Sequence, residues 1–229
     1  KSSQRVLVEA ARAFCQAGIA VVRFDFRGCG DSPGAFRDYG LIHWLEDVRA
    51  AAAFMKRRFA DMPSGLLGLR AGALPAARAV REAACDFLVF WAPVLDGGAY
   101  LRQELRKKLT KEMMTFGSAR ESRAALLERL ESGNEIDLDG YPVTGGLFSE
   151  LEDTVISGDE WERGTPVLAL DISPSRRPDP ALDTLREKPG VSVQSVHLQP
   201  FWNLIGYVDG SAAASLTRDW ILAAGERSV

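Results

Sequence analysis

The feature of this sequence that most constrains its fold is the alternation of short apolar runs with stretches of helical periodicity. Apolar residues recur every three or four positions in stretches that predict helices over 3–17, 41–59, 71–84 and 210–225. Runs rich in β-branched and aromatic residues predict strands over 19–26, 65–69, 86–95, 165–172 and 191–198. Strands that alternate with helices form βαβ units, so we expect an α/β fold with a mainly parallel sheet flanked by helices.

The stretch between the third and fourth predicted strands contains no convincing strand of its own. It is typical of helices near 99–116, 119–132 and 146–157, with the turn-rich segment SGNEIDLDGYPVTGG between the last two. An insertion of this size at one end of a parallel sheet usually covers a ligand site. We therefore predict a core made of residues 1–96 and 160–229, and a helical cap made of residues 97–159.

Charge and cysteine content exclude several kinds of partner. The chain of 229 residues has a net charge of −3, which gives no electrostatic reason to expect nucleic acid or an anionic membrane. No apolar run approaches the roughly 20 residues of a membrane span. Cys15, Cys29 and Cys85 lie far apart without C-x-x-C spacing, which argues against a disulfide framework and a zinc site. We expect a cytoplasmic protein without a metal or cofactor.

Residues 65–80 predict a strand that turns sharply into a helix. The frame Gly68-Leu69-Arg70-Ala71-Gly72 has the spacing of Gly-x-Ser-x-Gly, in which a nucleophilic serine stands on the turn, but arginine occupies that position. A guanidinium stays protonated and cannot be the nucleophile. Beside the free N–H groups of a helix start it can instead hold a carboxylate or phosphate. The alternative is that Arg70 forms an internal ion pair with an acid such as Asp25 or Asp31, or reaches solvent.

Four segments and a short motif carry a resemblance to a known family: FRGCGDS, GLRAGAL, FWAPVLDGGAYLRQELRKKLTKEM, ESGNEIDLDGYPVTGGLF and QPFW. In this order they resemble the α/β-hydrolases, and more narrowly the second type of the bacterial hydrolases named for association with the exosortase A system. The resemblance implies an α/β-hydrolase core with a cap insertion, and a link to exopolysaccharide production and envelope protein sorting.

The same resemblance implies a further strand between 19–26 and 65–69 that is not in this chain. A parallel sheet with an empty central position would leave two rows of backbone groups unpaired. We expect a segment upstream of Lys1, or a second chain, to supply that strand. The alternative is that the strand assignment is wrong.

An acyl hydrolase of this fold needs a nucleophile, an acid and a histidine, in that chain order. The acid should follow the fourth predicted strand, where Asp171 and Asp179 are available, although Asp179 precedes Pro180 and also suits a helix cap. The histidine should lie in the loop after the fifth strand. His197 comes nearest, but it lies on the strand itself, where a packed core histidine is the alternative.

The loop of residues 27–34 offers two replacements for the missing serine. Cys29 and Ser32 are expected at the same end of the sheet as Arg70. A thiol near Arg27 and Arg70 could have a lowered pKa and act as the nucleophile. Alternatively, the glycines beside Cys29 only supply backbone freedom, and Asp31 or Ser32 closes the turn.

Three hypotheses follow. The first is a degenerate hydrolase that binds a small anionic or acyl ligand through Arg70, Ala71, Gly28, Asp31, Ser32, Phe201 and Trp202. The second is an active ester or thioester hydrolase, with candidate catalytic positions Arg70, Cys29, Asp179 and His197. The third is a non-catalytic interaction protein that docks a partner or a second copy of itself through the cap. It predicts an exposed apolar patch of Tyr100, Leu101, Leu105, Leu109 and Met113.

Overall fold

A four-stranded parallel sheet forms the centre of the computed structural model, which describes residues 2–175 and 177–225. Its strands are β1 (Gly65–Leu69), β2 (Phe87–Trp91), β5 (Val167–Ser173) and β6 (Val191–His197). They are hydrogen-bonded in the order β1-β2-β5-β6, and every adjacent pair is parallel. The predicted α/β fold with a parallel sheet is confirmed.

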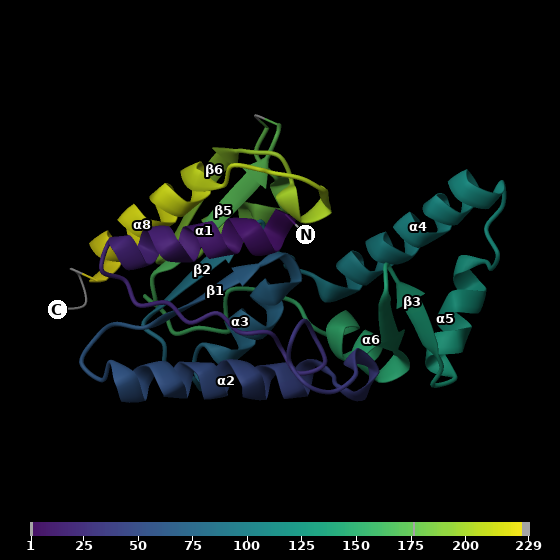
Figure 1. The fold of residues 1–229 in the computed structure, drawn as a ribbon, viewed down its shortest axis with the longest axis horizontal. Coiled ribbons are helices and arrows are strands. Elements are labelled where there is room, and N and C mark those ends of the chain that lie inside the picture. Colours follow the sequence, from purple (N-terminus) through teal and green to yellow (C-terminus); the bar gives the residue numbers. More distant parts are fainter. Residues whose placement is uncertain (1, 176, 226–229) are drawn as a thin grey trace.

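Helices cover both faces of this sheet (Figure 1). They are α1 (Ser2–Gln16) and α8 (Ser211–Gly225) on one face, and α2 (Leu41–Arg58) and α3 (Ala73–Ala79) on the other. The short α7 (Asp183–Arg186) lies between β5 and β6 in the chain. Leu88 and Phe90 of β2 join the buried cluster under α2 and α3, while Val89 and Trp91 join the cluster under α1 and α8. A strand buried on both faces in this way explains its continuous apolar sequence.

An insertion follows β2 and projects to one side of the sheet (Figure 1). Its elements are α4 (Gly97–Phe116), α5 (Arg123–Glu131), β3 (Glu135–Leu138), β4 (Tyr141–Thr144) and α6 (Gly145–Glu152). The expectation that this stretch lacks strands is wrong, because β3 and β4 pair as an antiparallel hairpin. Asp139 and Gly140 form its two-residue turn with φ of 53° and 91°. Asp-Gly is the sequence that such a turn with two positive φ angles prefers.

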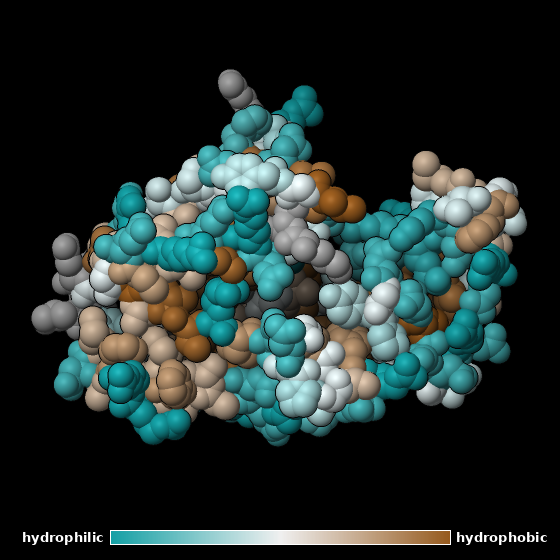
Figure 2. Space-filling model, viewed as in Figure 1, coloured by the Kyte–Doolittle hydropathy of each residue, from teal (hydrophilic) through white to brown (hydrophobic). Residues whose placement is uncertain are grey.

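The segment 19–26 was expected as a strand but has no strand hydrogen bonds. No described strand pairs with it, and β1 is an edge strand of the sheet. Val22 and Phe24 in this segment are exposed, and Figure 2 shows apolar surface between α1 and α2, where the segment lies. Its β-branched and aromatic sequence indicates a strand, but a strand exists only when a neighbour shares its ladder.

The insertion does not expose the apolar patch that the third hypothesis required. Leu101 and Leu105 of α4 are buried in the cluster that also contains Leu74 and Phe90, and of the five predicted residues only Met113 is largely exposed. The expected patch on 99–116 is therefore wrong as a whole. Helical spacing predicted one apolar face correctly, but the sequence did not show that the hairpin and α6 would cover it.

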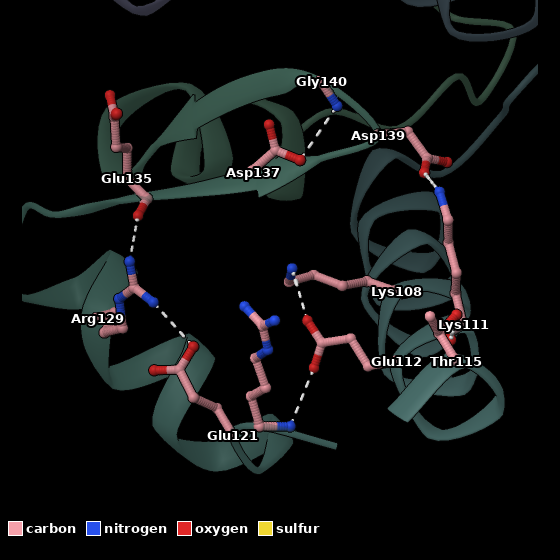
Figure 3. Close-up of polar contacts among 11 residues, drawn as sticks. Lys108, Lys111, Glu112, Thr115, Glu121, Arg129, Glu135, Asp137, Asp139 and Gly140 are labelled. Atoms are coloured by element: carbon pink, nitrogen blue, oxygen red, sulfur yellow. Dashed lines mark hydrogen bonds and ion pairs between the residues drawn. The ribbon is translucent and has the colours of Figure 1, made fainter. Parts of the chain in front are cut away.

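Ion pairs tie the outer part of the insertion together (Figure 3). Lys111 of α4 lies 2.8 Å from the carboxylate of Asp139 in the hairpin turn. Arg129 of α5 contacts Glu121 at 2.8 Å and donates a second hydrogen bond to the carbonyl of Glu135 at 2.9 Å. These pairs are solvent-exposed, so each contributes little to stability. They connect α4, α5 and the hairpin to one another.

None of the helices in the described ranges is long and apolar enough to cross a membrane.

Candidate functional site

The turn after β1 has the geometry that the sequence frame predicted. Arg70 stands between β1 and α3 with φ of 53°, in the left-handed region that a non-glycine residue rarely adopts. Its carbonyl accepts a hydrogen bond from Val94 N–H at 3.1 Å, which holds the turn against the end of β2. A Cβ on Gly68 would lie 2.6 Å from the Cα of Ala73, so only glycine allows the strand and helix to approach this closely.

The side chain of Arg70 turns toward the ends of β2 and β6. One terminal nitrogen donates to the carbonyl of Ala92 at 3.0 Å, and the guanidinium carbon lies 5.0 Å from the centroid of the Trp202 ring. Among the described residues, no carboxylate lies within 4.0 Å of Arg70. The alternative pairing with Asp25 or Asp31 is wrong, because Asp25 instead accepts the backbone N–H of Asp31 at 3.2 Å.

Burial lowers the pKa of Arg70, because its charged form has lost part of its water shell. The nearby acidic groups Tyr100, Glu104 and Asp179 act in the opposite direction. A guanidinium remains protonated at neutral pH even so. Arg70 is therefore a partly desolvated cation that no described carboxylate contacts directly.

A hollow of about 410 Å³ lies beside Arg70 at the carboxyl ends of the strands. This is a size typical of small-molecule sites. Its wall contains Arg70, Ala92, Pro93, Asp171, Ile172, Ser173, Pro174, Arg177, Pro178, Asp179, Pro180, Leu182, Pro200 and Trp202. The segments that follow β1, β2, β5 and β6 all contribute. Binding sites of open α/β sheets are found at this edge.

The two candidate acids share one hydrogen-bond network in the wall of the hollow. Asp171 lies in β5, is buried, and accepts the backbone N–H of Asp179 at 2.9 Å. Asp179 in turn accepts the N–H of Ala181 at 2.9 Å and caps the short helix Pro180–Leu182. The alternative interpretation of Asp179 as a helix cap is confirmed. Both residues nevertheless line the same space as Arg70.

The predicted histidine does not line this hollow. His197 is the last residue of β6, paired in register with Ser173, and its side chain is exposed. Trp202 does line the hollow, whereas Phe201 beside it is buried and packs with its ring centroid 6.5 Å from that of Trp91. Of the predicted Phe-Trp pair, one ring therefore faces the hollow and the other fills the core.

The loop of residues 27–34 does not activate Cys29. Burial raises the pKa of the Cys29 thiol, and the carboxylates of Asp25 and Asp47 raise it further. The expected lowering by Arg27 is wrong, because Arg27 is bound to Asp47 at 2.8 Å and its charge is already compensated. A thiol with a raised pKa is protonated at neutral pH and is a poor nucleophile.

The remaining predicted ligand contacts lie elsewhere. Ser32 donates its hydroxyl to the carbonyl of Asp25 at 2.6 Å, as the loop-closing alternative proposed. Gly28, Asp31 and Ser32 are absent from the wall of the hollow beside Arg70, as is Ala71 in the turn that precedes α3. The structure thus brings Arg70, Trp202 and Asp179 together from the predicted set. The proline-rich lining after β2 and β5 was not among the predicted site residues, and the only sequence signal for it is its place after the ends of two strands.

A parallel sheet with a strained strand-turn-helix at its carboxyl edge and a helical insertion after the next strand defines the α/β-hydrolase fold. The chain belongs to the serine aminopeptidase S33 family, whose sequence pattern it matches over residues 2–135. That match includes the Arg70 turn. No curated protein matches the chain in a sequence search. Within the described ranges, no group of three or more His, Cys, Asp and Glu side chains could hold a metal ion.

Solved structures agree with this fold assignment. Ferulic acid-bound Est1E from Butyrivibrio proteoclasticus aligns with a TM-score of 0.69 at 17% identity, covering 96% of this chain and 82% of that protein. A proline iminopeptidase-related protein from Thermus thermophilus aligns with a TM-score of 0.60 at 18% identity, covering 98% and 86%. A monoacylglycerol lipase from Paleococcus ferrophilus aligns with a TM-score of 0.56 at 15% identity, covering 94% and 88%. At these identities the likeness concerns the fold alone.

Proposed function

We propose that this protein binds a small carboxylate or acyl anion in the hollow beside Arg70. The observation that carries the proposal is the state of that guanidinium. It is partly desolvated, lies over the Trp202 ring and donates one hydrogen bond to a neutral carbonyl, while no described carboxylate contacts it. A carboxylate can accept paired N–H bonds from a guanidinium and would compensate a charge that burial has made unfavourable.

We propose further that the protein is a degenerate hydrolase. Arginine occupies the nucleophile position of the turn, and a guanidinium cannot attack a carbonyl. The two candidate replacements for serine lie outside the hollow and are unsuited to the role: the Cys29 thiol has a raised pKa, and the Ser32 hydroxyl is donated to a backbone carbonyl. The exposed position of His197 outside the hollow also supports this proposal.

We propose a cytoplasmic location, which the three widely spaced cysteines favour. We also propose a role beside exopolysaccharide production, which rests only on the resemblance to the hydrolases named for the exosortase A system. The division into a core and a cap of residues 97–159 belongs to the same proposal, as does docking of a partner or second copy through that cap. In this setting a binding protein would sense or carry an acyl or carboxylate intermediate without consuming it.

Binding is tested by titration calorimetry with 3-phenylpropanoate, a carboxylate whose ring can pack on Trp202. The expected result is binding that weakens roughly 10- to 100-fold in Arg70→Gln, as expected when a charge-assisted hydrogen bond is lost. Arg58→Gln is the matched control, since Arg58 is an exposed arginine at the end of α2. Equal affinity in wild type and Arg70→Gln would show that the anion does not sit on this guanidinium.

Catalysis is tested with short p-nitrophenyl esters on wild type and Arg70→Ser. A heat-unfolded sample of Arg58→Gln measures the background hydrolysis. We expect wild type to show no turnover above this background. Turnover by wild type that disappears in Cys29→Ala or His197→Gln would contradict the degenerate assignment and support the active-hydrolase hypothesis.

A further inference from the structure

The hollow beside Arg70 contains charges of both signs. Arg70 and Arg177 contribute cations to its wall, while Asp171 and Asp179 contribute carboxylates. No pair among these four residues lies within the 4.0 Å of an ion pair. Elsewhere in the described ranges such charges commonly pair, for example Arg27 with Asp47 at 2.8 Å. The cations and carboxylates in the wall of the hollow therefore form no ion pairs with one another.

Backbone N–H groups donate hydrogen bonds to both carboxylates without neutralising their charges. One oxygen of Asp171 accepts the N–H of Asp179, and one oxygen of Asp179 accepts the N–H of Ala181. An N–H group carries only a partial charge, so two carboxylate charges remain in the wall of the hollow. Glu104, the acid near Arg70 on the insertion, differs in this respect because Lys107 pairs with it at 2.7 Å.

A wall that carries both signs of charge favours a ligand that also carries both signs over a simple anion. A carboxylate placed on Arg70 gains from the guanidinium, but Asp171 and Asp179 repel it across a space of about 410 Å³. A ligand with a second, cationic end removes that repulsion and replaces it with attraction. The Trp202 ring and the proline-rich wall would then contact the apolar part of the ligand.

We propose that the hollow binds a zwitterion, a free amino acid or short peptide with both ends unblocked. Its carboxylate lies on Arg70, and its ammonium group lies on the side of Asp171 and Asp179. The inference rests on the proposed function, since it keeps the anion on Arg70. It adds a requirement for a positive charge at the other end of the ligand.

The test compares compounds that differ in one charge at a time. Calorimetry is carried out on the full chain with L-phenylalanine and glycyl-L-phenylalanine, then with the N-acetyl form and the amide of each. We expect at least one free zwitterion to bind, and both of its blocked forms to bind at least 10-fold more weakly. An N-acetyl form that binds as tightly as its free parent would overturn the inference.

Variants separate this inference from the function on which it rests. Asp179→Asn removes a charge but keeps an oxygen that can cap Pro180–Leu182. We expect it to weaken the zwitterion about 10-fold and to leave the N-acetyl form equal or tighter. Asp61→Asn, at an exposed turn residue, is the control for a change of net charge and should alter neither.

The outcomes are distinct. If N-acetyl-L-phenylalanine or 3-phenylpropanoate binds through Arg70 and the free zwitterions do not bind more tightly, the zwitterion inference fails and the proposed function stands. If no compound of the set binds, both fail. If zwitterions bind equally to wild type, Asp179→Asn and Arg70→Gln, they occupy another place and the inference fails.

Discussion

The guanidinium carbon of Arg70 lies 5.0 Å from the centroid of the Trp202 ring, so the turn after β1 and the loop after β6 meet over the edge of the sheet. The contact places a cation on an aromatic face, and both residues line the same hollow. One N–H of the guanidinium is donated to the carbonyl of Ala92, which leaves other N–H groups for a carboxylate. The contact with Trp202 thus helps to position Arg70 as well as stabilising it.

Trp202→Ala should weaken binding of 3-phenylpropanoate by roughly 5- to 30-fold. The change removes a cation–π contact of about 1–2 kcal/mol and frees the guanidinium to rotate. Trp202→Phe retains a ring and should lose no more than about threefold. The measurement is calorimetry on both variants, together with the midpoint of urea unfolding. Equal affinities for Trp202→Ala and wild type would show that the ring does not orient Arg70.

The two glycines of the turn should respond in opposite ways to alanine. Gly68→Ala places a Cβ 2.6 Å from the Cα of Ala73, a backbone atom that cannot move aside, and should destabilise the protein by about 1–3 kcal/mol. At Gly72 a Cβ meets nothing within 4 Å and φ is −63°, so Gly72→Ala should be neutral or stabilise by up to about 1 kcal/mol. Urea unfolding of both variants measures the difference. A tolerated Gly68→Ala would contradict the close packing of β1 on α3.

A third prediction concerns a buried hydrogen bond between the sheet and the helix α8 packed on it. The indole N–H of Trp91 in β2 donates to the hydroxyl of Thr217 in α8 at 2.8 Å, and both side chains are fully buried. Thr217→Val keeps the shape but leaves the N–H without an acceptor, and should reduce the free energy of unfolding by about 1–3 kcal/mol. Thr217→Ser keeps the hydroxyl and should lose less. If both variants were equally stable, the hydrogen bond would contribute nothing.

Thiol reactivity tests the electrostatics of the loop at 27–34. Burial and two carboxylates raise the pKa of Cys29, and burial raises that of Cys85. At pH 8 both should therefore react more slowly with iodoacetamide than the exposed Cys15, and peptide mass spectrometry of the labelled protein measures the order. Asp25→Asn removes one cause and should speed labelling of Cys29. Labelling of Cys29 before Cys15 would instead revive it as a nucleophile.

The same shifts fix the direction of a pH effect on stability. A thiol whose pKa is higher in the folded than in the unfolded state remains protonated to a higher pH in the folded protein. Above the unfolded pKa, the unfolded chain binds fewer protons, so the contribution of Cys29 and Cys85 to stability falls as the pH rises. Cys29→Ser and Cys85→Ser, measured by urea unfolding from pH 7 to 10, should each flatten this decline.

Local sequence patterns determined most of the secondary structure of this protein. Helical periodicity predicted α1, α2 and α8, because a helix with one buried face repeats its apolar residues at a fixed interval. Short β-branched and aromatic runs predicted the four strands of the sheet, because strands of a covered parallel sheet are buried on both faces. The frame of residues 68–72 likewise predicted a sharp turn with Arg70 on it, since backbone sterics allow few sequences there. Asp139-Gly140 could have predicted the hairpin by the same local reasoning.

The tertiary structure alone decided what depends on partners distant in the chain. Residues 19–26 have the composition of a strand but remain unpaired, since a strand needs a neighbour that its own sequence does not specify. Arg70 could have paired with Asp25 or Asp31, yet the fold brought it to Trp202, Asp171 and Asp179 instead. The segments after β1, β2, β5 and β6 meet at one edge because the sheet is parallel. The strand order is set by the packing of helices on both faces of the sheet. No short window of sequence contains that packing.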